Sequence, residues 1–218
     1  MNKLWELIEI PAGRPVVIAC PGPGALEGIA RIPENAYVIA CNYGVCLPLP
    51  RVDEWMVLDE ACLHAPWWEQ AFMRPACSGS QMVMSEELRD DLIVTAFLEG
   101  GGVRPDAPML VTAQGPALSY TDPFPVYGAL RGNSTVAGGA AQRAYWGARS
   151  STNARELPPL YWLGVPLRGG EYFDRLAGYN RLEWPYVATL NALVRVLEAA
   201  GMHSIALSET ALEMERGF

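Results

Sequence analysis

The sequence predicts an α/β fold of three layers, with a mainly parallel sheet covered by helices on both faces. Short apolar runs without polar alternation recur along the chain, as expected for strands that are buried on both faces. The run at 15–20 ends at a turn rich in glycine and proline, at residues 21–24, and a second run follows at 36–41. This order of strand, turn, helix and strand is typical of the opening βαβ unit of a nucleotide-binding sheet.

Seven apolar runs predict strands, at residues 15–20, 36–41, 55–59, 81–84, 109–113, 160–164 and 204–207. The first three runs end in turn-forming or polar residues, namely Pro21-Gly22, Asn42 and Asp59-Glu60. Parallel sheets of this kind bind ligands at the carboxyl ends of their strands. The Gly/Pro turn and Asn42 therefore lie where a ligand is expected.

Helices are predicted between these strands. A short helix is expected at 24–32, and Ser85 is a cap for another. Ser134 or Thr135 can cap a helix whose near face consists of small residues and which is expected to stop at Gly147. The clearest amphipathic pattern covers 185–200.

The succession of elements predicts one Rossmann-like domain spanning residues 1–218. Residues 114–131 contain three prolines and several aromatic residues, and they are expected to form a long loop that acts as a lid or cap.

Composition excludes several classes of protein. Half of the 218 residues are hydrophobic, which excludes a disordered chain. The net charge of −8 argues against a nucleic-acid polymer as partner, because binding to a phosphate backbone needs clustered Lys and Arg. No apolar run approaches the ~20 residues of a membrane span, and the first residues lack the apolar stretch of a secretory signal. A cytoplasmic location is expected.

The five cysteines follow no disulfide or zinc pattern. Their odd number and the absence of a Cys-x-x-Cys pair argue against a disulfide framework and a zinc ribbon. The expectation is reduced thiols that are partly buried, at Cys20, Cys41, Cys46, Cys62 and Cys77.

The turn Gly22-Pro23-Gly24 is a candidate phosphate site, because backbone amides before a helix can bind phosphate. It is not the full dinucleotide fingerprint, and Asn42 stands where a dinucleotide site would have a carboxylate for the ribose. A mononucleotide or phosphate is therefore favoured over a dinucleotide. A tight turn that binds no ligand explains the same pattern equally well.

Two further groups of polar residues are candidates. The Asn42 amide has two donors and an acceptor that suit the sugar or base of a nucleotide, although an Asx turn is the alternative. Asp59, with Glu60 and His64, could act in acid–base chemistry or bind a metal, but no further ligand lies at a suitable spacing. The aromatic group Trp67, Trp68 and Phe72 favours packing over stacking on a ligand.

The order of these motifs resembles two related groups of proteins. They are the bacterial sialyltransferases that use CMP-sialic acid and the proteins similar to archaeal 6-hydroxymethylpterin diphosphokinase. The motifs that carry the resemblance are Gly22-Pro23-Gly24-Ala25-Leu26, Asn42, Asp59, Ser134-Thr135-Val136, Gly147 and Leu163-Gly164-Val165-Pro166. The resemblance covers most of the chain in order and proportion.

The resemblance implies a transferase that binds a nucleotide or a nucleotide-sugar. It implies a binding role for seven residues, Gly22, Pro23, Gly24, Asn42, Ser134, Thr135 and Gly164. It also implies that Asp59 is a general base or metal ligand, with Mg²⁺ as cofactor if the chemistry is that of a diphosphokinase.

Departures from the family pattern motivate an alternative. Gly24 stands in place of a serine, Pro166 in place of an aspartate, and no histidine matches the catalytic histidine of the sialyltransferases. The alternative is a non-catalytic binding or assembly module that keeps the fold without the chemistry. Such a module would expose an apolar patch around Trp67, Trp68 and Phe72, and the aromatic content is compatible with a homodimer.

Overall fold

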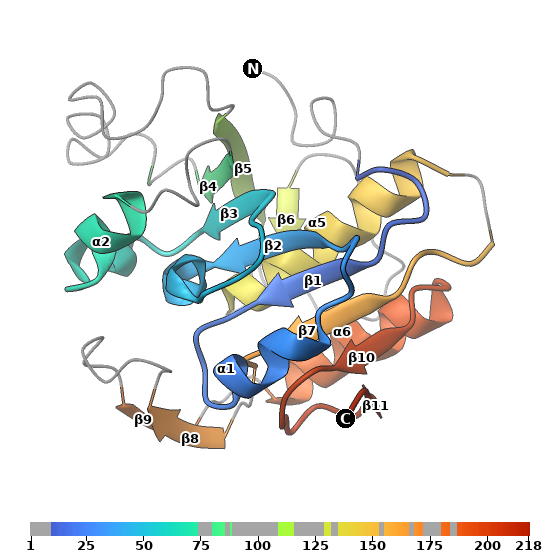
Figure 1. Ribbon diagram of the computed structural model, residues 1–218. Coiled ribbons are helices and arrows are strands. Elements are labelled where there is room, and N and C mark those ends of the chain that lie inside the picture. Colours follow the sequence, from blue (N-terminus) through green and yellow to red (C-terminus); the bar gives the residue numbers. More distant parts are fainter. Residues whose placement is uncertain are drawn as a thin grey trace.

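The computed structural model describes residues 10–73, 80–85, 88, 109–115, 129–131, 135–152, 155–165, 168–171, 180–183 and 187–218. In these ranges nine strands form one sheet, and every pair of neighbours in it is parallel (Figure 1). The sheet comprises β1 (Val16–Ala19), β2 (Tyr37–Cys41), β3 (Glu54–Val57), β4 (Gln81–Ser85), β5 (Met109–Gly115), β6 (Ala129–Arg131), β7 (Leu160–Leu163), β10 (Ser204–Ala206) and β11 (Glu215–Arg216). The predicted α/β class with a parallel sheet is confirmed.

The helical elements within the described ranges are α1 (Ala25–Gly28), η1 (Ile29–Arg31), η2 (Asn42–Cys46), η3 (Glu60–His64), α2 (Trp68–Met73), α5 (Val136–Ser150) and α6 (Val187–Ala199), where η marks a 3-10 helix. A separate antiparallel pair is formed by β8 (Arg168–Glu171) and β9 (Asn180–Glu183). No helix in the described ranges is long and apolar enough to cross a membrane.

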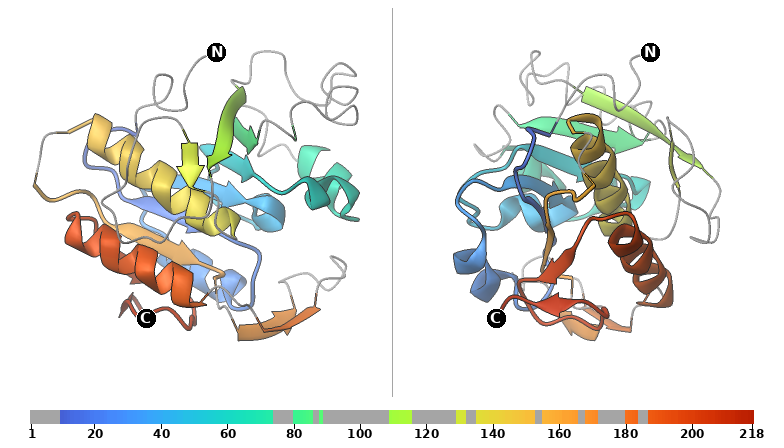
Figure 2. Two further views of the ribbon diagram at one scale, coloured as in Figure 1. Left: turned by 180° about the vertical axis from the view of Figure 1, so that it is seen from behind. Right: turned by 90° about the vertical axis from the view of Figure 1, so that its right-hand side faces the viewer.

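Alternate residues of the central strands face opposite layers. Val16 and Ile18 of β1 belong to the core beneath α5 and α6, whereas Val17 and Ala19 belong to the core beneath α1. Figure 2 shows α5 and α6 together on one face of the sheet and α1 on the other. Burial on both faces explains why the strand sequences show no polar alternation.

The strand order reverses beside β1. In the order β11-β10-β7-β1-β2-β3-β4-β5-β6, the chain proceeds from β1 outward to β6 and then returns to place β7 on the other side of β1. Val16 thus pairs with Tyr37 on one side and with Leu160 on the other. In sheets of this type ligands bind in the crevice outside the carboxyl ends of the strands, where the order reverses.

Helix α5 packs on the sheet through a stripe of alanines, namely Ala137, Ala140, Ala141, Ala144 and Ala148. The helix begins after Thr135, whose Oγ1 accepts a hydrogen bond of 3.0 Å from the amide of Gly138, so the predicted cap is confirmed. The prediction that the helix stops at Gly147 is wrong, because the helix continues to Ser150. Gly147 is needed for packing instead: a Cβ there would lie 2.4 Å from the Arg143 guanidinium and 2.6 Å from the Ile10 side chain.

Two other predicted boundaries differ. The predicted helix at 24–32 is divided into the single turn α1 and the 3-10 turn η1. The two ends of the predicted loop at 114–131 belong to strands, because β5 extends to Gly115 and β6 occupies Ala129–Arg131. The remainder of that predicted lid lies outside the described residues.

Candidate functional site

The carboxyl ends of β1 and β7 remain joined beyond their last paired residues. The amide of Cys20 donates to the carbonyl of Leu163 at 2.8 Å, and the amide of Gly22 donates to the carbonyl of Gly164 at 3.0 Å. Gly164 has φ +66°, and a Cβ there would lie 2.0 Å from the carbonyl oxygen of Cys20. This position therefore requires glycine, and two of the predicted site residues are in direct contact.

The C-terminal segment packs against the carboxyl ends of these strands. The Oγ of Ser208 accepts a hydrogen bond of 2.9 Å from the amide of Gly164, and Gly24 lies beside the Ser208 side chain. Thr210 Oγ1 donates to the carbonyl of Val165 at 2.6 Å. Sequence reasoning did not find this contribution, although a polar residue directly after the strand at 204–207 was a usable signal.

The turn Gly22-Pro23-Gly24 offers less to a phosphate than the sequence predicts. The Gly22 amide is already bonded to Gly164, and the Ala25 amide donates to the carbonyl of Gly22 at 3.2 Å. Helix α1 has only four residues, too few to add an appreciable dipole. The turn therefore packs against β7 and does not form a complete phosphate cradle.

Asn42 directly follows β2 at the same edge of the sheet. Among the described residues it is the one non-glycine residue with a positive φ, +48°, a conformation that asparagine tolerates. Its carbonyl accepts a hydrogen bond of 2.9 Å from Trp55 Nε1, which fixes the backbone. Its Oδ1 atom is buried and has no hydrogen-bond partner within the described ranges. A buried amide oxygen without a partner is costly, so this atom needs a hydrogen-bond donor that the described residues do not supply.

The N-terminus of α5 lies at this carboxyl edge. Arg143 contacts Glu54 at the start of β3, and Gly147 packs against Ile10 before β1, so the second half of the helix lies over the amino ends of the strands. The first turn, after Thr135, therefore lies over the carboxyl ends, as Figure 1 shows beside the arrowhead of β1. A 15-residue helix has the positive end of its dipole there, although the amides of Gly138 and Gly139 already donate to Thr135. Ser134 lies outside the described residues.

Asp59 follows β3, and its side chain hydrogen-bonds within the turn that begins η3. Its Oδ1 accepts a hydrogen bond of 2.9 Å from the amide of Ala61 and caps η3, while the side chain is exposed. Burial and the Asp59 charge raise the pKa of the Cys62 thiol to about 12. In the part of the chain that the structure describes, no three His, Cys, Asp or Glu side chains gather to hold a metal ion.

The predicted site residues thus separate into two groups on one edge of the sheet. Gly22, Gly24 and Gly164 form the packed wall between β1 and β7. Asn42 and Thr135 lie on the side of β2 and α5. Asp59 is one strand further away, and its hydrogen bond to the Ala61 amide holds it in its own turn.

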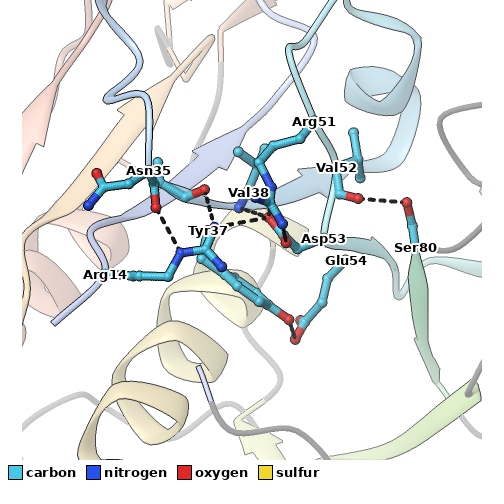
Figure 3. A network of polar contacts seen from close by, with 10 residues as sticks. Arg14, Asn35, Tyr37, Val38, Arg51, Val52, Asp53, Glu54 and Ser80 are labelled. Atoms are coloured by element: carbon cyan, nitrogen blue, oxygen red, sulfur yellow. Dashed lines mark hydrogen bonds and ion pairs between the residues drawn. The ribbon is translucent and has the colours of Figure 1, made fainter. Parts of the chain in front are cut away.

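A buried polar network occupies the opposite, amino edge of the sheet (Figure 3). Glu54 Oε1 accepts a hydrogen bond of 2.8 Å from Tyr37 Oη. It also accepts one of 2.5 Å from Arg143 Nη2, and both Glu54 and Arg143 are buried. Beside it, the amide of Val38 donates to Asp53 Oδ2 at 2.9 Å. No local pattern predicts this network, because Arg143 and Glu54 lie 89 positions apart in the chain.

The aromatic group is part of the core. Trp67 and Trp68 are buried and pack with Tyr43 and Trp55. The expected apolar surface patch is therefore wrong for these two tryptophans, whereas the interpretation as packing is confirmed. The side chain of Phe72 lies outside the described residues.

The described cysteines, Cys20, Cys41, Cys46 and Cys62, are buried and free, as expected. Cys77 lies outside the described residues.

Comparison of the chain with protein-family models, with curated proteins and with solved structures found no match.

Proposed function

We propose that this protein binds a nucleotide or nucleotide-sugar at the carboxyl ends of β1 and β2, beside the N-terminus of α5. The observation that carries this proposal is the Asn42 amide. Its oxygen is buried without a partner within the described ranges, at a strand end next to the point where the strand order reverses. Ligands of doubly wound sheets bind at this place.

The two ends of the ligand would meet different chemistry. The amides of the first turn of α5 suit the phosphate, with Thr135 holding that turn in shape. The Asn42 amide suits a sugar hydroxyl or a base edge, because both need a donor and an acceptor. Gly22, Pro23, Gly24 and Gly164 would form the wall beside the ligand.

Group transfer is the activity that the sequence resemblance implies for such a site. The exposed Asp59 carboxylate lies at the same edge and would serve as general base, or as a ligand of Mg²⁺ in diphosphokinase chemistry.

The non-catalytic module is the second candidate. It is favoured by the Gly22 amide, which is bonded within the protein, and by Ser208, which occupies the crevice between β1 and β7.

The test begins with thermal unfolding against CMP, a CMP-sugar, a UDP-sugar, ATP, GTP and a pterin, each with and without Mg²⁺. A ligand at 100 times its Kd adds about 2.7 kcal/mol, which raises the Tm by several degrees. The Mg²⁺ dependence of a positive result separates diphosphokinase-like from sialyltransferase-like chemistry.

Substitution of Asn42 locates the site. Asn42→Gly removes the amide and suits the positive φ, so the fold is expected to persist while affinity falls about tenfold, or ~1.4 kcal/mol. Asn35→Ala is the matched control, since Asn35 is exposed before β2 at the opposite edge and contributes its carbonyl to Arg14.

Two results would count against the proposal. Unchanged affinity in Asn42→Gly would remove Asn42 from the site. No binding by any compound of the panel would favour the non-catalytic module and direct attention to protein partners.

A further inference from the structure

Two cysteines face each other at the carboxyl ends of β1 and β2. Ala19 of β1 pairs in register with Ala40 of β2, so Cys20 and Cys41 are opposite one another at the next position. Adjacent strands are about 4.8 Å apart. This separation lies within the range of Cα distances that a disulfide bridges.

The two thiols also share a face of the sheet. Both side chains belong to the core beneath α5. Burial, and after it interaction with the neighbouring Cys20 side chain, raises the pKa of the Cys41 thiol. Cys41 is fully buried, whereas 7% of Cys20 is exposed.

We propose that Cys20 and Cys41 form a reversible thiol–disulfide site, whose oxidising substrate is a small hydroperoxide. The pair is a modification site distinct from nucleotide binding, and it does not depend on a nucleotide being bound.

Cys20 is more exposed than Cys41, so Cys20 is the thiol that reacts first with the hydroperoxide. The Cys20 thiolate attacks one oxygen of the hydroperoxide ROOH, the O–O bond breaks, and the products are Cys20 sulfenic acid and an alcohol or water. The Cys41 sulfur then attacks the Cys20 sulfur. The S–O bond breaks, the S–S bond forms, and the sulfenic hydroxyl leaves as water with the Cys41 proton.

Burial explains why Cys41 is the resolving and not the attacking thiol. Removal from water raises the pKa of the Cys41 thiol, so it stays protonated and unreactive toward peroxide in solution. Its position opposite Cys20 in the strand register makes it the partner for Cys20 once Cys20 is oxidised.

The other described cysteines provide the contrast. Cys46 and Cys62 belong to the core on the opposite face of the sheet, so the sheet separates them from the pair. Cys62 is exposed to the same extent as Cys20, 7%, and is therefore a matched control for access of peroxide to a thiol.

The experiment treats the folded full-length protein with hydrogen peroxide, blocks the remaining thiols with iodoacetamide and maps the peptides by mass spectrometry. We expect a Cys20–Cys41 disulfide and a fall from five free thiols to three, reversed by dithiothreitol. Trypsin separates Cys20 from Cys41 by cleaving after Arg31, so the bond appears as two linked peptides.

Variants test the assigned roles. In Cys41→Ala, Cys20 is expected to stop at the sulfenic acid, which dimedone traps. In Cys62→Ala, the disulfide is expected to form as in the unaltered protein. Circular dichroism detects a variant that does not fold. The experiment on the unaltered protein still tests whether the disulfide forms, whatever the variants show.

The proposal is overturned if the folded protein loses no thiols to peroxide, or if Cys20 links to another cysteine as readily as to Cys41. Formation of the bond only after unfolding in guanidinium would overturn it equally. Nucleotide binding is measured separately on the reduced protein, so failure of either proposal leaves the other standing.

Discussion

The ion pair between Glu54 and Arg143 is the residue-scale feature with the largest expected effect on stability. Both side chains are almost fully buried, and they join β3 to α5 across 89 positions of the chain. The alanine side chains of α5 are small and do not interdigitate deeply with the sheet, so they do little to fix the position of the helix along it. The ion pair fixes that position and, with it, the first turn of α5 at the candidate site.

Breaking this pair is expected to be costly. Arg143→Met leaves the Glu54 carboxylate buried with Tyr37 as a partner, and we expect a loss of about 3–5 kcal/mol in the free energy of unfolding. The double variant Glu54→Leu/Arg143→Met is expected to be more stable than Arg143→Met, because it removes the buried charge. Urea denaturation measures both.

An exposed ion pair supplies the control. Arg195 and Glu213 are mostly exposed, so Arg195→Met is expected to cost at most about 1 kcal/mol. If Arg143→Met and Arg195→Met lower the free energy of unfolding by similar amounts, the buried ion pair contributes no more to stability than the exposed one.

Residue-scale features were the least predictable from sequence. Glu54 and Arg143 follow no local motif, and their contact exists only once β3 and α5 are packed. Asn42 could be predicted as a candidate site residue because it directly follows an apolar run. Such a position is visible in the sequence without knowledge of tertiary contacts. The Cys20–Cys41 contact requires the register of two strands, which composition does not give.

At the scale of elements, the apolar runs predicted seven strands of the sheet because strands buried on both faces need apolar residues at every position. The edge strand β11 was not predicted. Its two residues, Glu215 and Arg216, are charged and exposed, and only their pairing with β10 makes them a strand.

A histidine anchors this edge strand. His203 Nε2 lies 2.6 Å from Glu215 Oε2, and Nδ1 lies 3.0 Å from Glu198 Oε2 at the end of α6. Hydrogen bonds to Glu198 and Glu215 raise the pKa of His203 above 6.5. The protonated ring therefore joins β11 to the end of α6.

We expect the attachment of β11 to weaken as the pH rises. A raised pKa in the folded state means that the stabilisation is complete below pH 6.5 and is lost as the pH passes through the folded-state pKa. The group is half exposed, so the change is about 0.5 kcal/mol. Hydrogen exchange of the Gly217 amide, which donates to Ala206, is expected to be faster relative to intrinsic exchange at pH 8.5 than at pH 5.5.

His203→Gln is expected to remove this pH dependence. His64→Gln, at the other histidine of the chain, is the control and should retain it. Equal pH dependence in His203→Gln and the unaltered protein would assign the effect to another group.

At the scale of the whole molecule, the sequence predicted the α/β class and the edge of the sheet that carries the candidate site. It did not predict how that edge is filled. Ser208 and the Gly22–Gly164 bond close the side toward β7, whereas Asn42 and the first turn of α5 remain on the side toward β2. Such details follow from contacts between residues distant in the sequence, as between Gly22 and Gly164 or Gly164 and Ser208, which local patterns do not encode.

The position of β1 in the middle of the sheet has a consequence for synthesis on the ribosome. Among the described strands β1 comes first in the chain, yet one of its two neighbours is β7, with Val16 paired to Leu160. Until β7 has emerged, β1 presents an apolar, unpaired edge that favours aggregation.

We therefore expect that arrested nascent chains ending before β7 remain sensitive to protease at β1 and bind chaperones. Chains that expose β7 and β10 outside the ribosome should become resistant. Protection of β1 in the shorter chains would mean that β1 to β6 form a stable unit alone. Completion of the sheet on both sides of β1 thus depends on strands that are translated after β6.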